Sequence, residues 1–212
     1  MKFISISIII SILICLIIIC VFNYPRKKID RIGIFGSVSK EVEPNSLLYK
    51  NIVNLAKNLP NDKFYITPNT KKGILGILLN NVNPEIRDRF ITFNSVFFKD
   101  NEVNTNYKII NTKNILEYEK ILFDTSKLNI FLPGGIGTFF EIISSIFLLA
   151  EGVDNEYILI LNIDGFYESI FTHIDNLHKN GYLRNNVYKK FIDKVHVFDN
   201  SEDIIHFITT NK

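Results

Sequence analysis

Hydrophobic positions along the chain fall into short apolar runs and longer stripes with helical spacing. The apolar runs predict strands at residues 31–35, 63–67, 89–98, 127–132, 157–163 and 194–198. The stripes predict helices at residues 46–59, 73–82, 111–124, 138–151, 165–180 and 201–210. Strands of almost continuous Ile, Leu, Val and Phe between amphipathic helices are typical of a parallel sheet covered on both faces. We therefore expect an α/β fold with a doubly wound parallel sheet.

A separate apolar run, from Phe3 to Phe22, precedes this pattern and contains no charge, proline or glycine. Twenty helical residues span roughly 30 Å, which matches the hydrocarbon core of a bilayer. The run predicts a transmembrane helix and attachment to a membrane. A cleaved signal peptide fits less well, because the run is long and no small-x-small cleavage site follows it. A buried core helix fits less well because the segment is apolar on every face.

Basic residues flank the apolar run and predict its orientation. Lys2 precedes it, whereas Arg26, Lys27 and Lys28 follow it directly. The heavier positive flank places the domain that follows on the cytosolic side. We therefore divide the chain into an anchor with a linker, residues 1–29, and one α/β domain, residues 30–212.

Charge and composition exclude several classes of function for the domain. The whole chain of 212 residues has a formal charge of +2, but four positive charges flank the apolar run, so residues 29–212 carry −2. No basic stripe remains for a nucleic acid backbone. Both cysteines, Cys15 and Cys20, lie inside the apolar run. The four histidines lack metal-ligand spacing, so we expect neither a disulfide nor a metal site in the domain.

The segment Pro133 to Glu141, PGGIGTFFE, follows a predicted strand and opens a predicted helix. Its glycines allow close approach of a ligand to the backbone and permit positive φ angles. The start of the helix offers unpaired N–H groups and the positive end of the helix dipole, which suit a phosphate group. The spacing differs from that of a P-loop, which needs a Lys after its last Gly, and from GxGxxG.

Glu141 has two interpretations from local sequence alone. Thr138 and Glu141 have the spacing of a capping box, in which the Glu closes back on the cap N–H. Alternatively, Glu141 is a carboxylate beside the sugar of a nucleotide, where it stabilises positive charge on the ribose and orients a water molecule. The spacing does not decide between a cap and a catalytic group.

The segment PGGIGTFFE resembles the PGGxGTxxE signature of the LOG (Lonely Guy) family of cytokinin-activating nucleoside 5′-monophosphate phosphoribohydrolases, whose members are often described as possible lysine decarboxylases. Two further stretches support the resemblance. Residues 161–183 are similar to the family's strand, its N-x-D-G-[FY]-Y turn and the next helix, and residues 34–37 (IFGS) are similar to its first strand and Gly-Ser turn. Together these stretches cover residues 31–210 in consistent order.

The resemblance implies a Rossmann-like domain, usually dimeric, that hydrolyses the N-glycosidic bond of an N6-modified AMP to the free base and ribose 5-phosphate. It implies no cofactor, and no motif marks a lysine as a Schiff-base site. Glu141 is the implied catalytic carboxylate. The implied phosphate and nucleotide ligands are Gly36, Ser37, Gly134, Gly135, Gly137 and Thr138.

Two departures from the family pattern bear on catalysis. Family enzymes carry a catalytic Arg in a HERK-like segment before the signature strand, and Tyr118 occupies that position here. Lys120 or Lys113 is the candidate substitute, although Lys lacks the planar fork of Arg. The second departure is the loop after the second strand, where the family has consecutive glycines and this chain has Pro68, which removes an N–H group.

Three hypotheses follow from these observations. The first is a membrane-tethered LOG-like phosphoribohydrolase. The second is a membrane-tethered nucleotide-binding protein that has lost catalysis and acts as a sensor or scaffold. The third, a structural domain without ligand, fits less well because three glycines in nine residues carry an entropic cost that packing alone does not offset.

Overall fold

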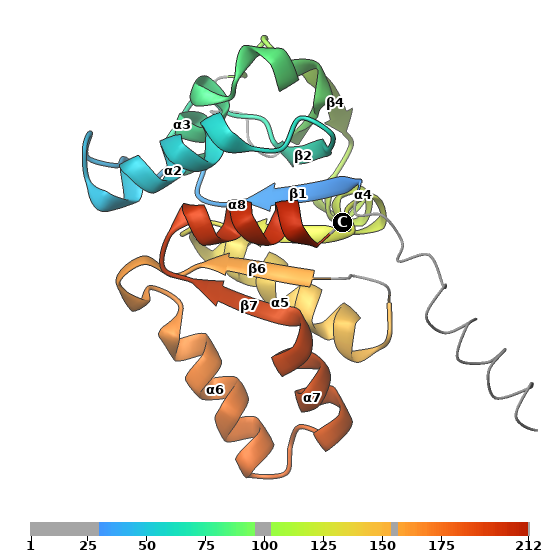
Figure 1. Ribbon diagram of the computed structural model, residues 1–212. Helices are drawn as coiled ribbons and strands as arrows, with labels where there is room; N and C mark the ends of the chain where they lie inside the picture. Colours follow the sequence, from blue (N-terminus) through green and yellow to red (C-terminus); the bar gives the residue numbers. More distant parts are fainter. Residues whose placement is uncertain (1–29, 96–102, 154–156, 212) are drawn as a thin grey trace, which may run out of the picture.

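A seven-stranded parallel sheet forms the middle layer of the protein (Figure 1). The computed structural model describes residues 30–95, 103–153 and 157–211. The strands are β1 (Arg31–Phe35), β2 (Phe64–Pro68), β3 (Phe90–Ser95), β4 (Lys108–Thr112), β5 (Leu128–Phe131), β6 (Tyr157–Leu161) and β7 (Val195–Phe198). Their order is β4-β3-β2-β1-β5-β6-β7, and every neighbouring pair is parallel. The predicted parallel, Rossmann-like sheet is therefore confirmed.

Helices cover both faces of the sheet, as the sequence predicts. One layer consists of α2 (Leu47–Asn58), α3 (Gly73–Asn81) and α8 (Ser201–Thr210). The other layer consists of α4 (Ile115–Thr125), α5 (Ile136–Ala150), α6 (Glu168–Lys179) and α7 (Asn185–Lys194). Two short 3-10 turns, η1 (Pro84–Arg89) and η2 (Ile163–Gly165), precede β3 and α6.

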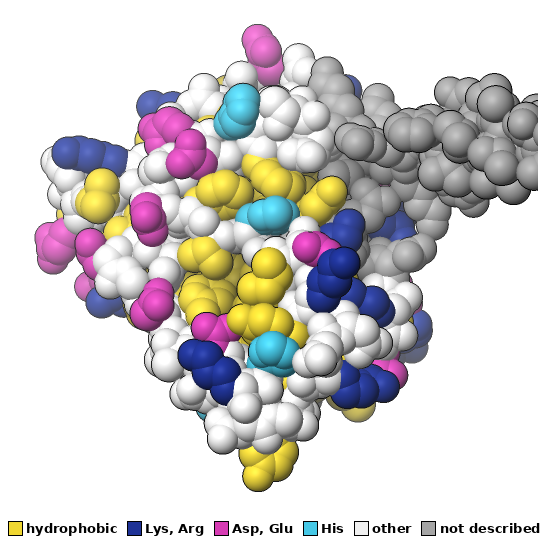
Figure 2. All heavy atoms as spheres, turned by 60° about the horizontal axis from the view of Figure 1, so that its bottom comes forward, with side chains coloured by type: hydrophobic (Ala, Val, Ile, Leu, Met, Phe, Trp, Pro, Cys, Tyr) yellow, Lys and Arg dark blue, Asp and Glu magenta, His cyan; other side chains and the backbone are white. Residues whose placement is uncertain are grey.

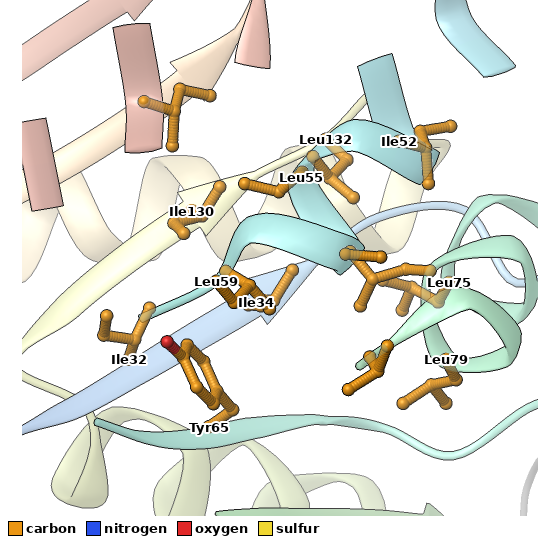
Figure 3. Close-up of a cluster of buried hydrophobic side chains, with 14 of the residues drawn as sticks. Ile32, Ile34, Ile52, Leu55, Leu59, Tyr65, Leu75, Leu79, Ile130 and Leu132 are labelled. Atoms are coloured by element: carbon orange, nitrogen blue, oxygen red, sulfur yellow. The ribbon is translucent and has the colours of Figure 1, made fainter. Parts of the chain in front are cut away.

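Alternation along the central strands supplies two separate cores. In β1, Ile32 and Ile34 face the α2, α3 and α8 layer, whereas Phe35 faces the opposite layer. Figure 3 shows Ile32 and Ile34 pointing into a cluster with side chains of α2, α3 and β5. Because β1 and β5 are buried on both faces, their near-continuous apolar sequence reflects a central position in the sheet.

Helices from the two ends of the described domain meet in the first layer. The Nδ2 atom of Asn54 in α2 donates to the Oγ atom of Ser201 in α8 over 2.8 Å. The backbone N–H of Ser201 donates to the Oδ1 atom of Asn51 over 2.7 Å. Asn51 is buried, so this pair of bonds fixes the start of α8 against α2.

The sequence prediction was wrong about two elements. The predicted helix at residues 111–124 begins later, at Ile115, because strand β4 occupies Lys108–Thr112 and Asn114 caps α4. The strand KIINT was missed because its apolar pair is too short to stand out from an Asn-rich surrounding. Helix α7 was also missed, since its mean hydropathy is low and only one side of it packs on the core.

Several boundaries also differ from the prediction. Strand β3 starts at Phe90 after η1, and residues 96–98 of the predicted strand lie outside the described residues. Helix α6 starts at Glu168, because Gly165 has a φ of 69° and belongs to the preceding turn. Helix α5 starts at Ile136, two residues before the predicted start.

The predicted membrane anchor, Phe3 to Phe22, lies outside the described residues, as does the linker up to residue 29. Within the described segments, no helix has the length and apolar character needed to cross a membrane. Membrane attachment and the orientation of the domain stay predictions.

Strand β7 forms one edge of the sheet, and apolar side chains on it and beside it are exposed to solvent. Val197 in β7 is 42% exposed and Ile192 in the adjoining α7 is 55% exposed. Figure 2 turns the lower side of Figure 1 forward and shows apolar side chains gathered in the middle of that face, with Lys and Arg along one margin.

His178 lies flat against Tyr188, with ring centroids 3.8 Å apart. Across the described segments, no three His, Cys, Asp or Glu side chains converge as a metal site.

Candidate nucleotide site

The PGGIGT turn joins the carboxyl end of β5 to the first turn of α5, at the point where the sheet order reverses. Strand β5 lies between β1 and β6, so the turn sits beside the ends of both neighbours. The N–H of Ser37 donates to the carbonyl oxygen of Pro133 over 3.2 Å, which ties the turn after β1 to the turn after β5. In sheets of this kind, ligands bind at this switch point.

The turn leaves space where a phosphate would lie. A Cβ atom built on Gly135 or on Gly137 would meet no atom within 4 Å, so both backbone segments face open space. Gly135 is the N-cap residue of α5, and no side chain caps the helix. The first N–H groups of α5 therefore point towards solvent at the positive end of the helix dipole.

Two details of this turn differ from the prediction. The positive-φ glycines of the described chain are Gly73, Gly152, Gly165 and Gly181, so none of the glycines of the PGGIGT turn uses that freedom. Gly134 is needed for a different reason, because a Cβ there would lie 2.2 Å from the Oγ1 atom of Thr138. Of the two interpretations of Glu141, the structure excludes the capping box, because the helix begins before Thr138 and Glu141 lies well inside it.

A cavity of about 560 Å³ opens over the ends of β1, β5 and β6. Its volume lies within the range of small-molecule sites. Its lining comes from the turns after these three strands and from α2 and α3: Ser37, Ser39, Lys40, Leu48, Ile74, Pro133, Gly134, Gly135, Ile163, Asp164 and Phe166. Lys40 and Asp164 are its charged groups, and they belong to the turns after β1 and β6.

Ser37 is held in place by its own turn. Its Oγ atom accepts a hydrogen bond from the N–H of Lys40 over 2.9 Å and from the N–H of Ser39 over 3.3 Å. The hydroxyl proton of Ser37 is then available to a ligand oxygen. Gly36 lies one residue earlier, at the end of β1, where a Cβ would approach the Cβ of Leu132 to 3.1 Å. It brings β1 and β5 together and does not line the cavity.

Glu141 projects from the buried side of α5 and is only 5% exposed. Burial raises its pKa well above the usual value, and the nearby Glu119 of α4 raises it further. Burial also raises the pKa of Glu119, to about 7. The Oε2 atom of Glu119 is buried without a hydrogen-bond partner in the described structure. Two acidic groups therefore lie behind the turn in a weakly solvated space.

Tyr118, the residue that the family resemblance aligns with the catalytic Arg, lies near Glu141. Its side chain is 2% exposed and meets the ring of Phe93 edge-on, at a centroid distance of 6.5 Å. Burial raises the pKa of Tyr118, with smaller contributions from the charges of Glu141 and Glu119. A neutral phenol thus stands where an Arg would hold Glu141 ionised.

Lys120, the proposed substitute for the Arg, points elsewhere in the structure. Its Nζ atom lies 2.5 Å from the Oδ2 atom of Asp124, one helical turn along α4, and both side chains are exposed. Lys113 is exposed and precedes α4, where its backbone N–H donates to Glu117 over 2.7 Å. Neither lysine lines the cavity.

A buried amide network closes the loop after β2, where the family has glycines. The side chain of Asn69 donates to Thr92 over 2.6 Å and accepts from the N–H of Asn104 over 2.6 Å. Asn104 in turn donates to Asn80 over 3.2 Å. Because the hydrogen-bond partners in this network are protein groups, the loop is committed to packing. From this part of the chain only Ile74, in the following helix, lines the cavity.

The structure thus brings Ser37, Gly134 and Gly135 together at the cavity, with Gly137 open beside them. Thr138 packs behind Gly134 and is 4% exposed. Sequence reasoning did not single out Lys40, Asp164 or Phe166, which line the cavity from other turns. The only local signal for Asp164 and Phe166 was their place in the N-x-D-G-F-Y turn.

Comparison with known proteins identifies the family of this chain. The sequence profile of the family described as "Possible lysine decarboxylase" matches residues 69–208. The chain belongs to this family, the LOG family. A cytokinin riboside 5′-monophosphate phosphoribohydrolase of Arabidopsis thaliana, LOG2, is 41% identical over 52 residues. That match spans 24% of this chain and 24% of the relative's length.

The solved structures of similar fold include proteins described as binding the molybdenum cofactor. A molybdenum cofactor binding protein from Rippkaea orientalis has a TM-score of 0.61 at 16% identity, and the match covers 87% of this chain and 98% of that chain. A Moco carrier protein from Chlamydomonas reinhardtii has a TM-score of 0.60 at 14% identity, with 86% and 96% covered. These similarities establish the Rossmann-like α/β fold, and a fold alone does not determine function.

Proposed function

We propose that this LOG-family protein binds a nucleoside 5′-monophosphate at the PGGIGT turn and hydrolyses its N-glycosidic bond. The observation that carries the proposal is the open, uncapped start of α5 beside the cavity. The phosphate would accept hydrogen bonds from the N–H groups at Gly135 to Gly137 and from the Ser37 hydroxyl. The ammonium group of Lys40, which lines the same cavity from the turn after β1, supports binding of the anion.

Glu141 is the proposed catalytic residue. In its ionised form it would stabilise the positive charge that develops on the ribose as the bond to the base breaks. A water molecule adds to the ribose carbon, and the base leaves with a proton. The raised pKa means that this carboxylate form becomes populated only as the pH increases.

The test is release of free base from AMP and from N6-substituted AMP by the purified full chain. We expect Glu141→Gln to abolish release while AMP binding, measured by calorimetry, persists. Gly137→Ala is the matched probe of the phosphate contact, because the added methyl group meets no protein atom and lies within a helix. We expect it to raise stability by up to about 1 kcal/mol and to weaken AMP binding. Equal base release by the wild type and Glu141→Gln would reject the catalytic proposal.

A second candidate function is nucleotide binding without turnover, as a sensor or scaffold. Tyr118 favours it, because a neutral phenol does not hold Glu141 ionised as an Arg would, and less of the catalytic carboxylate is then present. Proteins described as molybdenum cofactor carriers share the fold, so the fold itself accommodates binding proteins. Tight AMP binding by a folded chain, with no base released over hours, would select this function.

We also propose that the protein forms a homodimer through α5. Ile136, Phe139, Phe140, Ile143 and Phe147 are 39–84% exposed and recur at helical spacing along one side of this helix. A groove of about 200 Å³ between α5, α6 and α7 adjoins them and has an apolar lining. A ridge and a groove on one surface suit a two-fold interface, in which each fits the other.

The oligomeric state tests this surface. Sedimentation of the purified full chain in detergent should give twice the chain mass, and Phe147→Glu should give the monomer mass. A monomeric wild type would exclude the dimer. Membrane attachment through Phe3–Phe22 is proposed with it, and flotation of the expressed chain with vesicles tests that part separately.

A further inference from the structure

The turn between β6 and α6 is fixed from behind and presents two side chains to the cavity. The Oδ1 atom of Asn162 accepts the N–H of Tyr167 over 2.6 Å, and the Tyr167 hydroxyl donates to the carbonyl oxygen of Leu132 over 2.8 Å. Asn162 and Tyr167 are 5% and 3% exposed. Between them, Asp164 and Phe166 point outwards and line the cavity.

Both outward residues have exposed side chains, and Asp164 also has a strained backbone. Asp164 has a φ of 54°, in the left-handed region that non-glycine residues seldom adopt. No hydrogen bond or ion pair joins its carboxylate to another described residue. Phe166 is 54% exposed, although its neighbour Tyr167 is buried in the same turn. An exposed aromatic ring and an unpaired carboxylate on a rigid support are typical of a recognition site.

The positions of the charges orient a bound nucleotide. Lys40 lies on the β1 side of the phosphate turn and Asp164 on the β6 side, because β5 lies between these two strands. The carboxylate of Asp164 would repel a phosphate and accept hydrogen bonds from N–H groups. The flat ring of Phe166 offers a stacking surface of the kind that proteins use for nucleobases.

We propose that Asp164 and Phe166 recognise the base of the nucleotide, and this inference rests on the proposed function. Phe166 stacks on the base, and Asp164 accepts a hydrogen bond from an exocyclic amino group. The site then selects bases that carry an amino group at the edge facing Asp164 over bases that carry a carbonyl oxygen there. Asp164 and Phe166 are specificity residues and take no part in bond cleavage.

The experiment measures affinities of the full chain for AMP, IMP, 2′-deoxy-AMP and ribose 5-phosphate by calorimetry. IMP replaces the amino group of AMP by a carbonyl oxygen. The wild type should prefer AMP, and Asp164→Asn, which suits the left-handed backbone, should reduce AMP affinity roughly tenfold or more. The AMP-to-IMP preference should fall with it, since Asn can donate to the carbonyl. Phe166→Leu should weaken AMP and IMP alike, roughly tenfold, and leave ribose 5-phosphate unchanged.

Glu168→Gln is the matched control, because Glu168 is an exposed acid in the next helical turn and does not line the cavity. Its AMP affinity should equal that of the wild type. Tight AMP binding with unchanged preference in Asp164→Asn would overturn the inference and leave the proposed function standing. A loss for AMP that vanishes with 2′-deoxy-AMP would assign Asp164 to the ribose instead. No AMP binding by the wild type would reject the proposed function together with this inference.

Discussion

Replacing Glu119 by Gln should stabilise the protein, and the gain should depend on pH. Burial raises the pKa of Glu119 from 4.5 to about 7. The folded chain therefore holds a proton on Glu119 between these values that the unfolded chain has already lost. The contribution of Glu119 to the stability of the wild type is therefore highest below about pH 4.5, where Glu119 is protonated in both states. It falls as the pH rises to about 7, where the buried carboxylate becomes ionised in the folded chain.

The size of the effect follows from the shift. A difference of about 2.5 pKa units corresponds to about 3.4 kcal/mol at full ionisation. Because Glu119 is only partly buried, solvent screening reduces this to about 1–2 kcal/mol. For a domain of this size, we expect Glu119→Gln to melt about 3–6 °C higher at pH 8 and close to the wild type at pH 5.

Thermal unfolding at pH 5, 6, 7 and 8, followed by circular dichroism, would measure the difference in melting temperature. Glu41→Gln serves as the control, because Glu41 is exposed outside the helices and should show a constant difference across this range. A gain for Glu119→Gln that is the same at every pH would mean that burial of its charge is not the source of the cost.

Three further outcomes follow from the site. Base release should rise with pH as Glu141 ionises. In Glu119→Gln this rise should move to lower pH, because a neighbouring negative charge is gone. A pH–rate profile that is flat between 5 and 9 would contradict the role of Glu141. Tyr118→Arg should increase base release at least about tenfold, measured at pH 7 on protein shown to be folded, and a decrease with AMP binding intact would argue against the missing Arg as the limiting feature. Asn69→Ala should lower the free energy of unfolding by about 2 kcal/mol, because it strands buried partners at Thr92 and Asn104, and urea unfolding measures it.

Sequence alone predicted the central architecture because the central strands have a distinctive apolar sequence. The runs RIGIF, LNIF and YILIL are almost continuously apolar, which is typical of a parallel strand buried on both faces. The edge strand β4 and helix α7 carry weaker patterns, since each has one exposed side and few apolar residues. Their places depend on packing between distant segments, which local periodicity does not record.

The candidate site also has a part that the sequence predicts and a part that only the fold brings together. The PGGIGT turn could be predicted because the strand, the glycines and the helix start are contiguous in sequence. Lys40 and Asp164 face one cavity from turns more than a hundred residues apart, so only the fold brings them together. Local sequence left Glu141 open between a cap and a catalytic group, and the start of the helix at Ile136, with Thr138 packed against Gly134, excludes the cap.

The bonds between α2 and α8 have a consequence for how the site is made. Strand β1 pairs with β5 nearly a hundred residues later, and Asn51 accepts its bond from Ser201 another seventy residues on. Such distant pairings form late, since long loops must close before they are rewarded. A growing chain therefore has no cavity until β5 and β6 have joined β1, and α2 lacks its partner until α8 has been made. Nucleotide binding would then mark the folded domain and, by mass action, favour the state in which β1, β5 and β6 are joined.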